Sequence, residues 1–369
     1  MLYLFLWSLR GEASWLRVVG YPSTRIIAAA LTSLMLSLLL GPSFIRLLQS
    51  WQIGQPVRDD GPQTHQVKAG TPTMGGALIL FACLLATLLW ADLRNGFIWI
   101  ALGVTAGYGA IGFADDYLKL RRRSPKGLPG TIKLALQTAI ALAAALYLFD
   151  SGLYDARMNL RLALPLLDFY RYPMGLPHWV FVAFAVLVLV GSSNAVNLTD
   201  GLDGLAIGPC IISAFTFVAL AYAEGTVLRG FNIARYLRVP HLQGVAELAI
   251  FCGSMATAGV GFLWFNSYPA SIFMGDVGSL ALGGGLGAVA LLTKNELVWA
   301  ILGGIFVVEA LSVMVQVASF KLTGRRIFRM APLHHHYELK GWDEPKIVVR
   351  AWIVSFILAL LALATLKLR

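Results

Sequence analysis

Ten long apolar runs, separated by polar loops, constrain this 369-residue chain more than any other feature. Their approximate bounds are 26–45, 74–91, 96–114, 132–149, 177–195, 204–223, 245–264, 277–293, 297–319 and 351–366. Most approach the roughly 20 residues that a helix needs to cross a bilayer, whereas a β-barrel would show alternating segments of about ten residues. The chain is 58% hydrophobic and 13% charged, against about a quarter charged residues in soluble domains. We therefore predict an all-α polytopic membrane protein with about ten transmembrane helices.

The runs are expected to form one integral membrane domain over 1–369, because neither an internal repeat nor a linker divides the chain. Within it, the N-terminal segment 1–25 stands apart. Arg10 and Glu12 interrupt its apolar stretch, and no small-residue cleavage site follows, which excludes an ordinary signal peptide. Its tryptophans and arginines are typical of a helix that lies in the membrane interface. A partly alternating stretch at 158–164 predicts a small hairpin outside the membrane.

The basic loops predict how the helices are oriented. Lysines and arginines crowd the loops 115–131 and 320–350, and cytoplasmic loops of membrane proteins carry an excess of these residues. Ten crossings put these two loops on one side and both termini on the other. We therefore place the loops in the cytoplasm and the termini on the periplasmic side. Basic loops that flank the spans explain the net charge of +10, so we expect no nucleic-acid partner.

Five aspartates stand where apolar runs end or begin. They are Asp115 and Asp116 at the end of the third run, Asp200 and Asp203 after the fifth, and Asp276 before the eighth. The span count places all of them at the cytoplasmic face. Charges at membrane depth are costly unless they line a polar cavity. Because carboxylates from separate segments suit the task of holding a hard divalent cation against phosphate oxygens, we expect the active site at this face.

Two of these positions also have simpler interpretations. Adjacent helical residues point about 100° apart, so Asp115 and Asp116 would face different groups. The same pair would also suit solvated charges at a helix end. Asp276 directly precedes a glycine-rich run, where it fits either a helix N-cap or an anion site with a nearby cation.

The segment 194–204 carries polar residues at every third position, namely Asn194, Asn197, Asp200 and Asp203. A helix or a tight turn would present neighbours of this series on one side. A capped polar break between two helices explains one such residue well, but not four. We therefore expect this segment to bind a ligand.

Three consecutive histidines, His334, His335 and His336, lie in the loop 320–350 before the last run. Consecutive residues rarely ligate one ion together, so we expect these imidazoles to bind phosphate or to orient a carboxylate. Glu309, inside the ninth run, is an intramembrane acid. It lines the site or forms a buried interhelical hydrogen bond, and both alternatives stay open.

Four motifs together resemble those of the phospho-N-acetylmuramoyl-pentapeptide transferases, within the wider family of polyprenyl-phosphate sugar-1-phosphate transferases. The motifs are FADDY at 113–117, NAVNLTDGLDGLA at 194–206, FMGDVGSLALGG at 273–284 and MAPLHHHYELKGW at 330–342. The resemblance runs from about Arg58 to the C-terminus. The last motif resembles the branch that uses the muramoyl-pentapeptide, and not the branch that uses UDP-N-acetylglucosamine.

The resemblance implies a reaction between UDP-N-acetylmuramoyl-pentapeptide and undecaprenyl phosphate. The products would be undecaprenyl-diphospho-N-acetylmuramoyl-pentapeptide and UMP, with Mg²⁺ as cofactor. It also implies a homodimer in the lipid bilayer of the bacterial inner membrane. Two alternatives are a transferase of N-acetylglucosamine-1-phosphate and a secondary transporter with an intramembrane ion site. Transporters often show inverted repeats, and this chain shows none.

The resemblance also assigns roles to residues. Asp276 is expected to be the Mg²⁺ ligand and, with Asp115, Asp116 and His335, to be catalytic. Asp115 would act toward the lipid phosphate as a base, a covalent nucleophile or an electrostatic group, and these roles stay open. The residues expected to contact the substrates are Lys68, Lys126, Lys133, Asn194, Asn197, Asp200, Asp203, Phe273, Gly275, His334 and His336, with Asn197, Asp200 and Phe273 toward the uridine.

Overall fold

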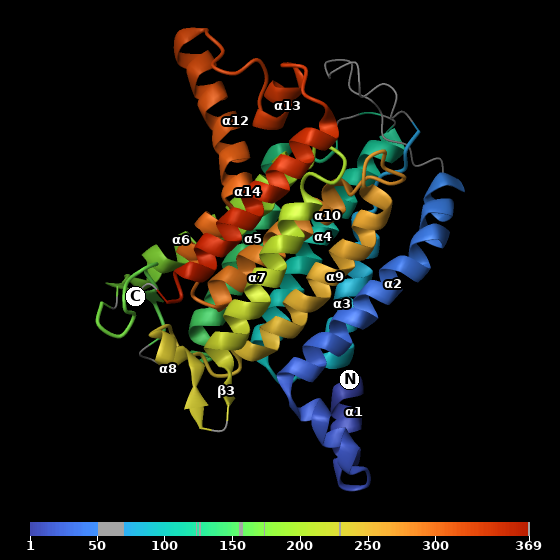
Figure 1. Ribbon diagram of the computed structural model, residues 1–369. Coiled ribbons are helices and arrows are strands. Elements are labelled where there is room, and N and C mark those ends of the chain that lie inside the picture. Colours follow the sequence, from blue (N-terminus) through green and yellow to red (C-terminus); the bar gives the residue numbers. More distant parts are fainter. Residues whose placement is uncertain are drawn as a thin grey trace.

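The chain forms a bundle of long helices with short elements at its two ends (Figure 1). The computed structural model describes residues 1–50, 70–122, 124, 127–154, 158–172, 174–228 and 230–367. The long helices are α2 (Pro22–Ser50), α3 (Gly76–Trp90), α4 (Gly96–Arg122), α5 (Gly130–Asp150), α6 (His178–Thr199), α7 (Ile207–Gly225), α9 (Leu248–Asn266), α10 (Gly275–Leu292), α12 (Gly304–Thr323) and α14 (Glu344–Ala364). The short helices are α1 (Leu2–Ser8), η1 (Leu9–Gly11), η2 (Ser14–Gly20), α8 (Ile233–Leu237), η4 (Val245–Glu247), α11 (Glu296–Leu302) and α13 (Leu333–Glu338).

The prediction of an all-α polytopic membrane protein is confirmed. Among the described residues, nine helices are long and apolar enough to cross a membrane, and α3 is a shorter apolar helix. The predicted run 297–319 differs, because it forms two helices, α11 and α12, that meet at Gly303. Two adjacent glycines, Gly303 and Gly304, stand at this break, and glycine is a usual cause of helix kinks. Which end of the bundle faces the cytoplasm stays a prediction.

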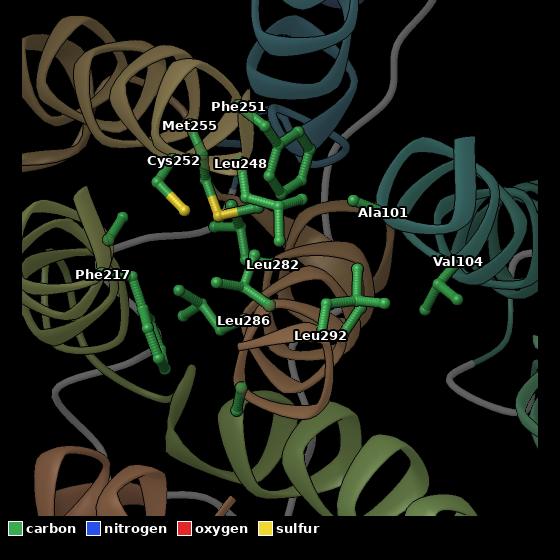
Figure 2. Packing of buried hydrophobic residues seen from close by; sticks show 14 of the residues in the cluster. Ala101, Val104, Phe217, Leu248, Phe251, Cys252, Met255, Leu282, Leu286 and Leu292 are labelled. Atoms are coloured by element: carbon green, nitrogen blue, oxygen red, sulfur yellow. The ribbon is translucent and has the colours of Figure 1, made fainter. Parts of the chain in front are cut away.

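The helix α10 lies at the centre of the bundle, and every residue from Val277 to Leu292 is buried. Its glycines let neighbouring helices approach closely. A Cβ atom at Gly283 would lie 2.5 Å from the carbonyl oxygen of Ser192 in α6, and one at Gly284 would lie 2.4 Å from the ring of Tyr108 in α4. Apolar side chains of α4, α7, α9 and α10 fill the remaining space (Figure 2).

The two ends of the bundle differ in what they carry. Figure 1 shows α13 and the upper part of α12 at one end, with the N-terminal segment, α8 and β3 toward the other. The C-terminus belongs to the second end, because the Lys367 ammonium lies 3.9 Å from the ring centroid of Tyr236 in α8. This end also carries two antiparallel hairpins. They are β1 (Arg161–Leu162) with β2 (Met174–Gly175), and β3 (Val227–Leu228) with β4 (Phe231–Asn232). The first agrees with the hairpin predicted around 158–164.

The closest contact between α4 and α10 has no room for a side chain. A Cβ atom at Gly112 would lie 2.2 Å from the carbonyl oxygen of Asp276. Gly103 is in the same helix, and a Cβ atom there would meet nothing within 4 Å. Gly112 therefore sets the distance between the two helices, whereas Gly103 does not.

We expect Gly112→Ala to lower the free energy of unfolding by about 1–3 kcal/mol, because the added methyl group forces α4 away from α10. Gly103→Ala is the matched control and should leave stability unchanged or slightly higher, since alanine favours helix. Thermal unfolding of both variants in detergent tests this. Equal stability of the two variants would contradict the close approach.

Candidate active site

Three of the predicted carboxylates meet at the end of α4 and the start of α10. Oxygen atoms of Asp115, Asp116 and Asp276 lie within 4.8 Å of one another. Asp115 and Asp116 are only 3% and 4% exposed. The convergence expected from the span count is therefore confirmed for these three residues.

Two lysines neutralise much of this negative charge. The Lys119 Nζ atom lies 2.5 Å from Asp115 Oδ2, 3.3 Å from Asp116 Oδ1 and 3.1 Å from Asp276 Oδ2. Lys133, at the start of α5, has its Nζ atom 2.7 Å from the same oxygen of Asp276. Two ammonium groups thus lie among three carboxylates, whose oxygens attract positive charge.

Backbone amides hold the first two carboxylates in place. The amide of Leu128 donates to Asp115 Oδ1 at 2.8 Å, and the amide of Val277 donates to Asp116 Oδ2 at 3.2 Å. Both oxygens of Asp115 are thus engaged, one by an amide and one by Lys119. A carboxylate held from both sides is rigid and fixed in orientation.

Asn197 and Gly275 complete the surroundings of Asp276. The Asn197 side-chain amide donates to Asp276 Oδ1 and to Ser279 Oγ, each at 2.8 Å. Gly275 has φ +72°, and a Cβ atom there would lie 2.6 Å from Asp116 Oδ2. Glycine is required at this position for both reasons. Asn197 and Gly275 therefore lie beside the carboxylates, and their role in substrate binding stays a prediction.

Asn194 points into a different network. Its side-chain amide donates to the Oε1 atom of Gln137 at 2.9 Å, and Gln137 donates to Ser193 Oγ at 3.2 Å. The hydroxyl of Tyr108 donates to the backbone carbonyl of Gln137 at 3.0 Å. This network joins α4, α5 and α6. Asn194 therefore contacts Gln137, whereas Asn197, about one helical turn later in α6, contacts Asp276.

The turn after α6 places Asp200 and Asp203 in different settings. Removal from water, together with the nearby charges of Asp276, Asp116 and Asp203, raises the pKa of Asp200 well above its usual range. The carboxylate of Asp203 accepts a hydrogen bond from the amide of Ala270 at 3.0 Å. Asp200 is thus electrically coupled to the three carboxylates, while Asp203 ties two loops together.

The histidine tract forms α13 beside that turn. His334 is 2% exposed, and its ring packs so tightly on Gly201 that a Cβ atom there would lie 2.2 Å from Nε2. Glu309 of α12 accepts a hydrogen bond from the backbone amide of His334 at 3.3 Å. This contact between α12 and α13 supports the interhelical role of Glu309.

The other two histidines have local partners. The Nδ1 atom of His335 lies 2.6 Å from Glu338 Oε2 within the same helix. His336 accepts a hydrogen bond from the amide of Arg329 at 3.1 Å. These contacts organise the loop, and the His334 ring is packed directly against Gly201 in the turn that follows α6.

Phe273 belongs to a loop that reaches the start of α3. Its amide donates to the carbonyl of Pro72, and its carbonyl accepts from the amide of Gly75, both at 2.8 Å. The ring of Phe273 is half-buried at the same end of the bundle as Asp276. Lys68 and Lys126 lie outside the described residues.

Two residues of this region escaped the sequence-based prediction. Lys119 contacts all three carboxylates, and its spacing of three and four residues from Asp116 and Asp115 is the signal that reveals it. Gln137 is fully buried in an apolar run. A polar side chain inside such a run is the corresponding signal.

Known proteins are similar to this one in sequence along the whole chain. Residues 98–294 match Glycosyl transferase family 4, and residues 68–80 match phospho-N-acetylmuramoyl-pentapeptide-transferase signature 1. Proteins named phospho-N-acetylmuramoyl-pentapeptide-transferase from Sorangium cellulosum, Anaeromyxobacter sp. strain Fw109-5 and Syntrophus aciditrophicus are 56%, 54% and 51% identical, each over 100% of both chains. The similarity therefore includes the first 50 residues, which contain none of the four motifs. The chain belongs to the phospho-N-acetylmuramoyl-pentapeptide-transferase family.

Proposed function

We propose that this protein transfers phospho-N-acetylmuramoyl-pentapeptide from its UDP-linked donor to undecaprenyl phosphate in the bacterial inner membrane. An oxygen of the lipid phosphate attacks the phosphorus that carries the sugar. The bond from that phosphorus to the bridging oxygen breaks, and UMP leaves with the electron pair. The observation that carries this proposal is the cluster of Asp115, Asp116 and Asp276, held by Lys119 and Lys133 at the end of apolar helices.

The donor set fits Mg²⁺. This ion prefers hard oxygen ligands and usually combines one or two carboxylates with substrate phosphates. The three carboxylates supply such oxygens, and the ammonium of Lys119 already lies among them, which reflects their attraction for a cation. Asp276 would be the main ligand. A bound Mg²⁺ supplies charge neutralisation at the diphosphate.

The lysines have a role of their own. Lysine acts as a point charge toward phosphate oxygens. Lys119 and Lys133 share one oxygen of Asp276, so a substrate diphosphate arriving there meets two ammonium groups that are already positioned. Prior positioning of charges is the largest part of catalysis in phosphoryl transfer.

Asp115 fits an electrostatic role better than that of a covalent nucleophile. Both of its oxygens are engaged, by the amide of Leu128 and by Lys119. The phosphate of the acceptor lipid is already largely ionised at neutral pH, so it needs little help from a base. These two facts favour direct attack by the lipid phosphate, which we propose here.

The first test replaces the principal metal ligand. We expect Asp276→Asn to lower Mg²⁺-dependent UMP release by at least about 100-fold, because it removes a charge at the reacting phosphates. The control is Asp150→Asn, the same change at an exposed aspartate that ends α5 at the opposite end. UMP is measured with purified protein, undecaprenyl phosphate and either donor, the muramoyl-pentapeptide or UDP-N-acetylglucosamine. Release with the second donor alone would contradict the proposed substrate.

The second test addresses Lys119. We expect Lys119→Met to lower kcat/KM for the nucleotide donor by about 100-fold, since three carboxylates then lose their shared counter-charge. Lys119→Arg keeps the positive charge and should retain more activity. Unchanged kcat/KM in Lys119→Met would show that Lys119 only stabilises the fold.

The third test distinguishes direct attack from a two-step route. A single in-line displacement inverts the configuration at the transferred phosphorus, whereas a covalent enzyme intermediate retains it. We expect inversion with a donor made chiral at that phosphorus. Retention would assign the attack to a protein carboxylate, with Asp115 the first candidate.

A further inference from the structure

The N-terminal segment is packed against the end of the bundle opposite the carboxylates. Tyr3, Leu16 and Val19 form a small buried core, against which Trp90 at the end of α3 also packs. The amino group of Met1 donates to the carbonyl oxygen of Leu88 in the same helix. The segment is therefore a fixed part of the fold.

A cavity of about 570 Å³ opens in this segment. It is lined by Trp7, Arg10, Gly11, Arg17, Gly20 and Tyr21. The volume falls within the roughly 300–1,000 Å³ of small-ligand sites. A Cβ atom at Gly20 would lie 2.6 Å from the Trp7 ring, so glycine is needed for that ring to form one wall.

The two arginines of the cavity keep their charges available. The Arg10 guanidinium carbon lies 4.4 Å from the ring centroid of Trp7, and its Nη1 atom donates to the Trp7 carbonyl at 2.8 Å. Within the described part of the chain, neither Arg10 nor Arg17 forms an ion pair. Glu12, the acidic residue of this segment, is exposed. By contrast, Arg25 is neutralised by Glu247 through two bonds of 2.6 and 2.5 Å.

The segment that forms the cavity also exposes aromatic rings. Tyr21, which lines the cavity, is 62% exposed, and Trp15, in the same segment, is 73% exposed. Tyr21 leads directly into α2, where Ile27 and Leu31 are also exposed. Aromatic rings with arginines beside an apolar helix face are typical of segments at the boundary between lipid head groups and acyl chains.

We propose that this cavity binds the phosphate head group of an anionic bilayer lipid. Arg10 and Arg17 contact the phosphate, the Trp7 ring orients Arg10, and the acyl chains lie along the exposed face of α2. Guanidinium groups bind phosphate oxygens in pairs of hydrogen bonds, which favours arginine over a diffuse positive surface. The site is independent of the transferase reaction, which takes place at the other end of the bundle.

The test measures lipid binding to the full chain by native mass spectrometry from detergent. Phosphatidylglycerol and phosphatidylcholine with the same acyl chains are offered in equal amounts. We expect preferential retention of phosphatidylglycerol, and a roughly 30-fold weaker affinity in Arg10→Gln/Arg17→Gln, because each arginine near an anionic surface contributes about fivefold. The matched control is Arg94→Gln/Arg171→Gln, two exposed arginines in loops at the same end. It should weaken binding by less than about threefold.

Several outcomes would overturn the proposal. Equal losses in the two double variants would indicate general surface charge, and equal retention of both lipids would remove the role of the anionic head group. Inorganic phosphate that raises the unfolding temperature as much as the lipid does would point to a soluble anion. Should the double variant fail to fold, Arg17→Gln alone replaces it, since Arg17 has no partner within the described residues whose loss would destabilise the chain. It should weaken phosphatidylglycerol binding about fivefold.

Discussion

Three buried carboxylates, Asp115, Asp116 and Asp276, meet between α4 and α10 at one end of the bundle, and their mutual repulsion must be balanced within the protein. Lys119 supplies most of that balance from the next turn of α4, and its ammonium contacts all three. The groups can come this close only because Gly112 lets the two helices touch through their backbones. The packing of α4 on α10 therefore also fixes the distances between the charged groups of the site.

The central position of α10 extends this constraint through the bundle. Its glycines let α4 and α6 pack closely against it, and beside them Gln137 of α5 finds hydrogen-bond partners at membrane depth in Asn194 and Ser193 of α6. A hydrogen-bonded polar layer of this kind fixes the rotation of α6 about its axis. One turn further along the helix, that rotation directs Asn197 toward Asp276. Asn194, in the hydrogen-bonded layer, and Asn197, at the carboxylates, thus lie on consecutive turns of α6.

Sequence reasoning succeeded where a residue's role follows from its place in a span. The alternation of apolar runs placed Asp115, Asp116 and Asp276 on one face before any contact was known, and the structure brings them together. Sequence reasoning was less informative where the role of a residue depends on which side chain it contacts. Asn194 belongs to the same three-residue series as Asn197, yet it faces Gln137. A repeat of three drifts around a helix with 3.6 residues per turn, so members of the series do not share one neighbour.

The sequence by itself determined the membrane class, the number of apolar segments and the end at which the acidic residues gather, because length and hydrophobicity depend only on local composition. Tertiary structure decided the break at Gly303, the shared counter-charge on Lys119 and the cavity around Arg10 and Arg17. Each of these depends on which backbone approaches which, and such distances are set by packing between segments far apart in the chain. For the same reason, the sequence of 1–25 predicted an interfacial segment, but the cavity that this segment forms is visible only in the folded chain.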